Sequence, residues 1–135
     1  MGLTNLEDLF LSDTQVTDAG LEHLKGLTKL EFLRLTNTNV TDAGLVHLKE
    51  LTRLRSLVLR ETNVTDAGLE HLAELESLQH LYLDKTKVTD AGVEQLKRMA
   101  KLRTLELVDT RITDKGIEML QQALPNCEIN ECPFD

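Results

Sequence analysis

The sequence predicts an α/β fold. It is a right-handed solenoid in which a parallel sheet lines the concave side of a short arc and short helices cover the convex side. Three observations predict it. The pentapeptide VTDAG recurs every 24 residues, the hydrophobic period changes from two to about 3.6 within each copy, and the copies follow one another without a linker. One such unit cannot bury its own apolar face, so stacked copies must share a core.

Five complete units and a partial one make up the chain, which is expected to be a single domain over residues 1–135. The units are 3–26, 27–50, 51–74, 75–98 and 99–122, followed by a capping half-repeat over 123–135. In that half-repeat the spacing is expected to shrink to 22, which puts Leu124, Cys127, Ile129 and Cys132 in the places of Leu102, Leu105, Leu107 and Thr110. Phe134 is expected to fold over the last leucines.

The first half of each unit predicts a strand and the second half a helix. The stretch LEFLRL at 30–35 alternates between apolar and polar residues, as a short strand does. Leu45, Leu48 and Leu51 then recur at helical spacing. Thr41 or Asp42 is the expected N-cap, because either side chain can accept hydrogen bonds from the unpaired N–H groups of the first turn.

The repeated polar residues invite a metal-binding interpretation, which helix spacing disfavours. Adjacent helices pack about 8–10 Å apart, whereas calcium needs six to eight oxygens at about 2.3–2.6 Å. The same spacing argues against zinc at the three helix histidines, His23, His47 and His71. We therefore expect no metal and no cofactor. The aspartates are expected to act as helix caps, the motif glycines as small residues where helices touch, and the histidines as solvent-facing.

The pattern LxxLxLxxTxVTDAGLxxL resembles the leucine-rich repeat, in particular the ribonuclease-inhibitor-like class and bacterial variants built on TDAGL. The resemblance covers residues 3–132 and implies a leucine-rich-repeat horseshoe whose usual role is protein binding. The asparagine that commonly follows the second strand leucine is replaced by a threonine in every unit (Thr14, Thr38, Thr62, Thr86 and Thr110). A buried hydroxyl can still satisfy the backbone of a neighbouring turn.

Composition excludes several classes of function. The net charge of −8 and pI near 5.0 argue against nucleic-acid binding, because phosphates repel such a field. No apolar run approaches the length of a membrane span, and the start MGLTNLEDLF resembles no signal peptide. Cys127 and Cys132 are expected to be buried free thiols. These features favour a cytoplasmic protein.

The units differ most at the strand residues between the inward leucines, which are expected to face the concave side. The three expected columns are Asp8, Phe32, Ser56, His80, Thr104 and Asn126; Phe10, Arg34, Val58, Tyr82, Glu106 and Glu128; and Ser12, Thr36, Arg60, Asp84, Val108 and Asn130. Three of the four aromatic residues fall there, beside arginine, and both residue types favour binding hot spots. The predicted partner-binding residues are Phe10, Phe32, Arg34, Val58, Arg60, His80 and Tyr82.

The predicted function is a non-catalytic module that binds a protein or peptide. Ser56, His80 and Glu106 fall close together, but a parallel sheet has no free N–H groups for an oxyanion, so catalysis is disfavoured. Aromatics that simply pack on a solvated strand surface are the plain alternative. Two other roles stay open: a homodimer through an uncapped N-terminal edge at Leu6, Leu9 and Leu11, or the substrate-receptor fragment of a larger signalling or ligase protein.

Overall fold

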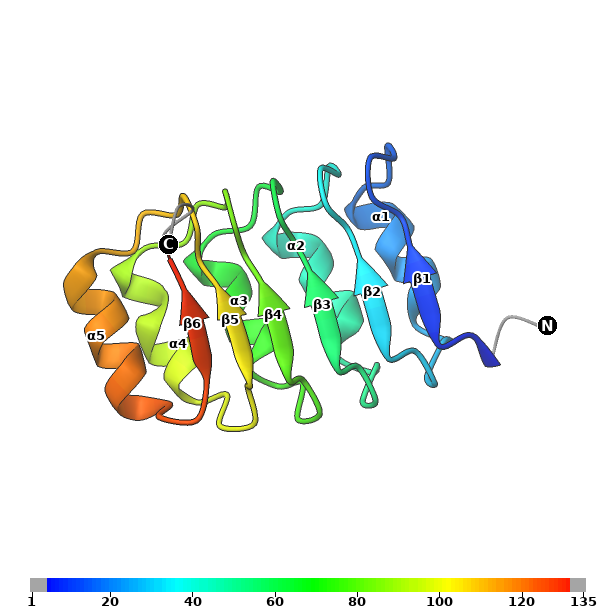
Figure 1. Ribbon diagram of the computed structural model, residues 1–135. Helices are drawn as coiled ribbons and strands as arrows, with labels where there is room; N and C mark the ends of the chain where they lie inside the picture. Colours follow the sequence, from blue (N-terminus) through cyan, green and yellow to red (C-terminus); the bar gives the residue numbers. More distant parts are fainter. Residues whose placement is uncertain (1–4, 132–135) are drawn as a thin grey trace.

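The computed structural model describes residues 5–131 as a parallel sheet backed by helices. Its six strands lie side by side in chain order, as Figure 1 shows. They are β1 (Asp8–Phe10), β2 (Phe32–Arg34), β3 (Ser56–Val58), β4 (His80–Tyr82), β5 (Thr104–Glu106) and β6 (Glu128–Asn130). The α/β solenoid predicted from the repeats is confirmed.

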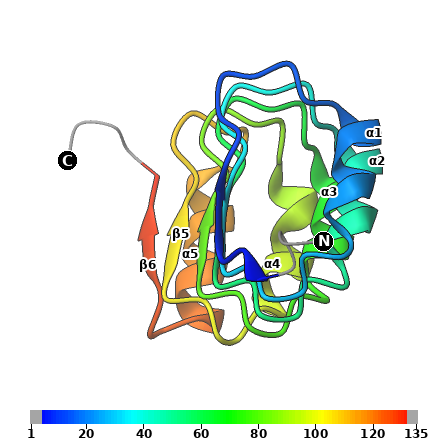
Figure 2. The same ribbon diagram turned by 90° about the vertical axis from the view of Figure 1, so that its right-hand side faces the viewer.

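The helices form a second layer on one side of the sheet, which is clearest in the rotated view of Figure 2. Three repeats combine an α-helical turn with a 3-10 turn: α1 (Asp18–Leu21) with η2 (Glu22–Leu24), α2 (Asp42–Leu45) with η3 (Val46–Leu48), and η4 (Asp90–Gly92) with α4 (Val93–Lys97). The other two have one continuous helix, α3 (Asp66–Leu72) or α5 (Asp114–Ala123). No helix among residues 5–131 is both long and apolar enough to cross a membrane.

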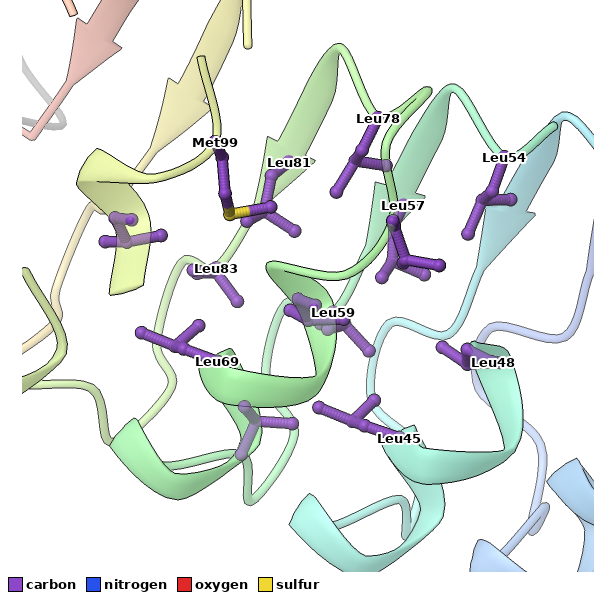
Figure 3. Packing of buried hydrophobic residues seen from close by; sticks show 14 of the residues in the cluster. Leu45, Leu48, Leu54, Leu57, Leu59, Leu69, Leu78, Leu81, Leu83 and Met99 are labelled. Atoms are coloured by element: carbon purple, nitrogen blue, oxygen red, sulfur yellow. The ribbon is translucent and has the colours of Figure 1, made fainter. Parts of the chain in front are cut away.

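Leucines from both layers meet in one aliphatic core. The central strand residues Leu33, Leu57 and Leu81 are fully buried, and so are the helix residues Leu45 and Leu69. Figure 3 shows Leu57 and Leu81 of the strands and Leu45 and Leu69 of the helices filling the space between helix and sheet in successive repeats. Burying one such leucine contributes about 1.5–3 kcal/mol, so every added repeat stabilises its neighbours through the shared core.

The last strand corrects the predicted spacing. Ile129 pairs with Leu105 and Glu128 with Thr104, so the offset stays at 24 and the expected 22 is wrong. The reason is the length of α5, whose ten residues place the turn before β6 later in its repeat than the turn before β5 is in the preceding one. Cys127 donates its N–H to the Leu124 carbonyl at 3.0 Å, the bond that Leu102 makes to Met99 one repeat earlier. Only one residue then separates Cys127 from the next inward position, so the strand regains its register.

Cys127 thus lies in the turn before β6. Its thiol is free and half-buried. Burial, assisted by the charge of Glu128, raises the pKa of this thiol to about 11, which keeps it protonated and unreactive at neutral pH. The expectations for Cys132 and Phe134 concern positions outside the described residues.

Threonine is the N-cap in each repeat, and the aspartate that follows it has a different task from the one expected. Asp18 begins α1, and its carboxylate accepts hydrogen bonds from the Thr41 N–H at 2.7 Å and the Thr41 hydroxyl at 2.5 Å in the next repeat. The same pair of bonds joins Asp42 to Thr65, Asp66 to Thr89, and Asp90 to Thr113. We call these contacts the Asp–Thr links. The recurring aspartate ties one repeat to the next.

The motif glycines make room for these links. A Cβ at Gly92 would come within 2.6 Å of both Asp66 Oδ1 and Leu69 Cδ1 of the preceding repeat. Gly44, Gly68 and Gly116 meet the aspartate of the preceding repeat in the same way. The expectation of small residues where helices touch is confirmed, and the contact is with the linking carboxylate as well as with leucine.

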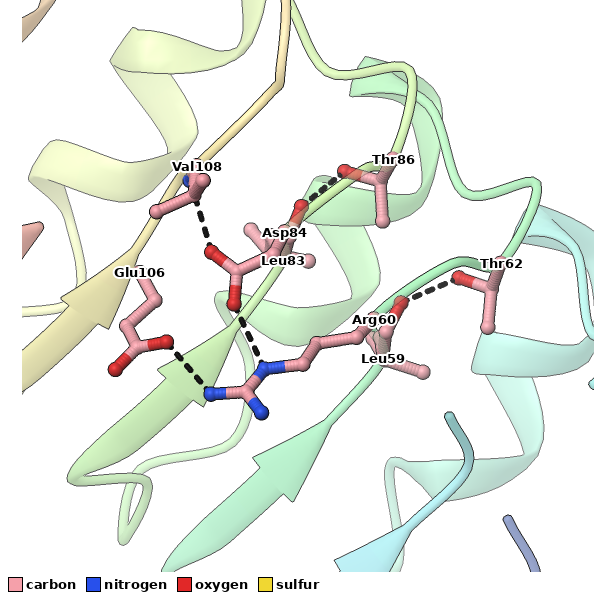
Figure 4. Close-up of polar contacts among 8 residues, drawn as sticks. All are labelled: Leu59, Arg60, Thr62, Leu83, Asp84, Thr86, Glu106 and Val108. Carbon is pink, nitrogen blue, oxygen red and sulfur yellow. Dashed lines mark hydrogen bonds and ion pairs between the residues drawn. The ribbon is translucent and has the colours of Figure 1, made fainter. Parts of the chain in front are cut away.

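Two further features complete each turn. The threonine hydroxyls donate to the strand carbonyl three residues earlier, as Thr62 does to Leu59 and Thr86 to Leu83, both at 2.7 Å (Figure 4). The residue before each of these threonines has a positive φ, and none of them is glycine: Asp13, Asn37, Glu61, Lys85 and Asp109.

The helix histidines lie apart from any cluster of metal ligands. His23 is exposed, whereas His47 and His71 are half-buried. Among residues 5–131, no group of three or more His, Cys, Asp or Glu side chains is placed to hold a metal ion.

Candidate functional site

The candidate site is the concave face, by which we mean the outward side chains of β1 to β6 and of the residues that follow them. Parallel register places the first column as Asp8, Phe32, Ser56, His80, Thr104 and Glu128. The second is Phe10, Arg34, Val58, Tyr82, Glu106 and Asn130. The first two predicted columns are therefore right through β5. On β6, Glu128 lies in the first column instead of the second, and Asn130 lies in the second instead of the third. Asn126 lies outside the strand.

The first strands of this face enclose an open hollow of about 720 Å³. Six of the seven predicted binding residues line it: Phe10, Phe32, Arg34, Val58, Arg60 and Tyr82. His80 is half-buried next to Ser56 on the strand pairing and does not line the hollow. The fold thus places six of the seven predicted residues around one hollow, and their role in binding stays a prediction.

Two phenylalanines form the apolar part of the hollow. Phe10 is 59% exposed and Phe32 is 38% exposed, although the central leucine of each strand packs in or against the core. The guanidinium carbon of Arg34 lies 4.8 Å from the centroid of the Phe10 ring. This is cation–π distance, and the contact fixes the arginine above an aromatic surface.

Arg60 has quite different surroundings, which Figure 4 shows. Its Nε donates to Asp84 Oδ2 and its Nη2 to Glu106 Oε1, both at 2.7 Å. Its guanidinium also lies 5.1 Å from the Tyr82 ring centroid. Three consecutive repeats therefore contribute to one ion network.

The ionisation of this network follows from burial and from its contacts. Burial works to lower the pKa of Arg60, but its hydrogen bond to Glu106 and the charge of Asp84 outweigh it and raise that pKa above the ordinary value. For Asp84, burial is the largest influence and raises its pKa, although the Val108 N–H, 2.8 Å from Oδ1, works against it. Asp84 is only 8% exposed, so this pair belongs to the scaffold of the face.

Sequence reasoning missed Asp84 and Glu106 as partners of Arg60. Both were placed on the correct face, and the charges of opposite sign in neighbouring columns were the available signal. That signal was ambiguous, because the same pattern also places Arg34 near charged residues. Arg34 nevertheless has no carboxylate partner among residues 5–131.

The serine, histidine and acid considered for catalysis are not joined. Ser56 and His80 are strand neighbours, as expected, but no hydrogen bond links them in the described part of the chain. Glu106 accepts from Arg60 instead.

Solved structures with the same architecture include several bacterial proteins. Internalin C2 of Listeria monocytogenes is 30% identical with a TM-score of 0.79, and the match covers 97% of this chain and 53% of that protein. An internalin (inlF) of the same species is 22% identical, with a TM-score of 0.69 and coverages of 96% and 44%. A leucine-rich repeat protein of Leptospira interrogans is 23% identical, with a TM-score of 0.65 and coverages of 95% and 38%. The chain thus spans about half the length of these proteins or less.

Family comparison agrees with the structural one. A family described as "Leucine Rich repeats (2 copies)" matches residues 4–47, and one described as "Leucine Rich repeat" matches 50–73 and 98–120. No curated protein matches the chain in sequence. The ribonuclease-inhibitor-like subclass stays a prediction. Together with the fold and its period, these matches show that the chain belongs to the leucine-rich repeat proteins.

Proposed function

We propose that the chain is a non-catalytic module that binds a protein or peptide on its concave face. Leucine-rich repeat proteins are generally protein-binding modules. One observation carries the choice of face: Phe10 and Phe32 are exposed on adjacent strands beside a cationic side chain. Core packing does not require aromatics at these outward positions, and aromatic residues with arginine dominate the energetics of binding sites.

The size of the face suggests what kind of partner it takes. Six strands about 4.8 Å apart and roughly 15 Å long give an area near 400 Å², about half of what one partner contributes to a standard interface. The face alone suits a peptide segment or a weakly bound protein. The cytoplasmic location and the absence of nucleic-acid binding stay predictions.

Selection of random displayed peptides against the immobilised chain tests this function. Replacing Phe10 and Phe32 together by serine removes the apolar surface, and we expect the selected peptides to lose binding while the melting temperature changes little. Met119 is the matched control, because it is 37% exposed on α5, away from the sheet. Met119→Ser should leave binding intact. Equal loss with both variants, or binding that survives Phe10→Ser/Phe32→Ser, would remove the concave face from consideration.

A second function, self-association through β1, is favoured by one observation. Leu6, Leu9 and Leu11 are half-buried, whereas their counterparts one repeat later, Leu30, Leu33 and Leu35, are fully buried. A chain or repeat added at β1 would cover them. Light scattering over a range of concentrations tests this. A dimer that dissociates in the Leu9→Asp variant would support self-association, and a monomer at every concentration would exclude it. A receptor role within a longer protein is a third proposal, suggested by the partial coverage of internalin C2.

A further inference from the structure

We infer that the partner of the concave face is a protein segment that carries a carboxylate close to an apolar side chain. The apolar group packs on Phe10, Phe32 and Val58, and the carboxylate pairs with Arg34. This inference rests on the function proposed above and specifies the chemistry of its ligand.

The two arginines of the face are not equivalent, and this difference carries the inference. The guanidinium of Arg60 already donates to two carboxylates at 2.7 Å. Arg34 forms no ion pair within residues 5–131, and its guanidinium is held over the Phe10 ring. Arg34 therefore presents a cation whose fork of N–H donors matches a carboxylate in a bidentate pair, whereas Arg60 has little left to offer.

The surroundings of Arg34 set what must accompany that carboxylate. Phe10 and Val58 flank it on the neighbouring strands, and Phe32 lies two residues before it on β2. Neighbouring strands are about 4.8 Å apart, and side chains two residues apart on one strand are about 6.6 Å apart. A carboxylate on Arg34 thus brings an adjacent side chain over a phenylalanine ring or Val58. In a bound segment this corresponds to an acidic residue within one or two positions of an apolar one.

Charge elsewhere on the face fixes the direction of such a segment. At the far end, the single guanidinium of Arg60 is shared by two carboxylates, which leaves an excess of negative charge there. Glu128 adds to it, and the outward positions of β5 and β6 include no cation. A second acidic group on the ligand is repelled there, so its acidic end lies over β2. An extended polyanion is disfavoured as well, because the chain has a net charge of −8.

The experiment compares the peptides selected on the unmodified chain with their binding to two variants. Arg34→Met removes the charge but keeps an apolar side chain, and Arg55→Met is the matched control, because Arg55 pairs with Glu31 and does not line the hollow. We expect the selected peptides to be enriched in Asp or Glu within two positions of an aromatic or aliphatic residue. A synthetic copy of the strongest peptide should bind Arg34→Met about tenfold more weakly, the effect of losing one charge-assisted pair. Its binding to Arg55→Met should change less than about threefold, since Arg55 lies outside the hollow.

A charge reversal at Arg34 tests the same pairing in the opposite direction. Selection on Arg34→Glu should replace acidic residues by lysine or arginine in the enriched peptides. Peptides that need Phe10 and Phe32 but show no acidic enrichment, or that bind Arg34→Met unchanged, would overturn the inference and leave the proposed function standing. Failure to select any peptide that needs these phenylalanines would overturn both. A second copy of the chain as the occupant, seen as self-association abolished by Phe10→Ser/Phe32→Ser, would also overturn the inference.

Discussion

The carboxylate of Asp66 accepts two hydrogen bonds from Thr89, one from its N–H at 2.7 Å and one from its hydroxyl at 2.5 Å. Asp66 begins α3, and Thr89 is the N-cap of the helical turn in the next repeat. One side chain thus complements the dipole of its own helix and fixes the start of the following one. The recurrence of aspartate at this position follows from stacking.

Replacing an aspartate that forms an Asp–Thr link should therefore lower the free energy of unfolding more than replacing the equivalent aspartate that forms none. We expect Asp66→Ala to lower the free energy of unfolding by about 2 kcal/mol, because two hydrogen bonds to a charged group are lost. Asp114 occupies the same motif position, but its carboxylate accepts no hydrogen bond among residues 5–131. Asp114→Ala should cost about 0.5 kcal/mol, the value of a helix-dipole contact alone. Urea denaturation measures both, and equal losses would refute the linking role.

Glycine at the helix contact gives a second prediction, in which alanine behaves against its usual helix preference. Gly92→Ala should destabilise the fold by about 1–3 kcal/mol, since the new Cβ would overlap Asp66 and Leu69 of the preceding repeat. Nothing lies within 4 Å of a Cβ built on Gly26. Gly26→Ala should accordingly be neutral or slightly stabilising. Thermal unfolding of the two variants compares them, and a stabilised Gly92→Ala would show that the repeats are not in close contact there.

The turn after each strand offers a stabilising change. Glu61 has φ 57° and Lys85 has φ 59°, a left-handed conformation that costs side chains other than Asn, Asp and Gly about 1–2 kcal/mol. Asn37 already occupies the equivalent position with φ 55°. Glu61→Asn should raise the free energy of unfolding by about 0.5–1 kcal/mol. The reverse change, Asn37→Glu, should lower it, in part because Asn37 also donates to Asp13 at 2.9 Å. A Glu61→Asn variant no more stable than the parent would argue against the left-handed turn.

Two aspartates should contribute to pH-dependent stability with opposite signs. Burial raises the pKa of Asp84 in the folded chain, so the folded state binds more protons than the unfolded one just above the ordinary value of 3.8. Stability from this residue therefore falls as the pH rises from 3.8 through the folded pKa. The Thr113 hydroxyl and N–H lower the pKa of Asp90, so its contribution is present above 3.8 and is lost as the pH falls through the lower folded value.

Asparagine variants separate these contributions. Relative to the parent, Asp84→Asn should gain stability as the pH is raised from acid to neutral, and Asp90→Asn should lose it over the same change. Denaturation curves at both pH values provide the comparison. The same trend in both variants would contradict the assigned environments.

The sequence predicted the fold because the period recurs almost unchanged. Leu33, Leu57, Leu81 and Leu105 occupy one place in four copies, and strict repetition fixes both strand register and the face on which Phe10, Phe32 and Arg34 lie. Prediction failed where repetition fails. Helix α5 runs to Ala123 and a turn follows it, so Asn126 and Cys127 lie before β6, and Glu128 and Asn130 fall one column away from their predicted places.

Partners distant in sequence were the other limit. The TD motif predicts a cap from local physics, and Thr41 is indeed the N-cap of α2. The carboxylate of Asp18, however, accepts from the N–H of Thr41, which lies 23 residues further along the chain. The sequence of a single repeat does not show whether its aspartate bonds its own helix or the next repeat. Arg60 presents the same difficulty, since it bonds residues one and two repeats further along the chain, and only coordinates distinguish it from Arg34.

Backbone amide shifts of the isotope-labelled chain, titrated with the strongest selected peptide, test the binding claim most directly. We expect the shifted resonances to cluster on β1, β2 and β3, around Phe10, Phe32, Arg34 and Val58, with the helices α1 to α5 little changed. Shifts concentrated on the helices, or spread evenly over the chain, would contradict it.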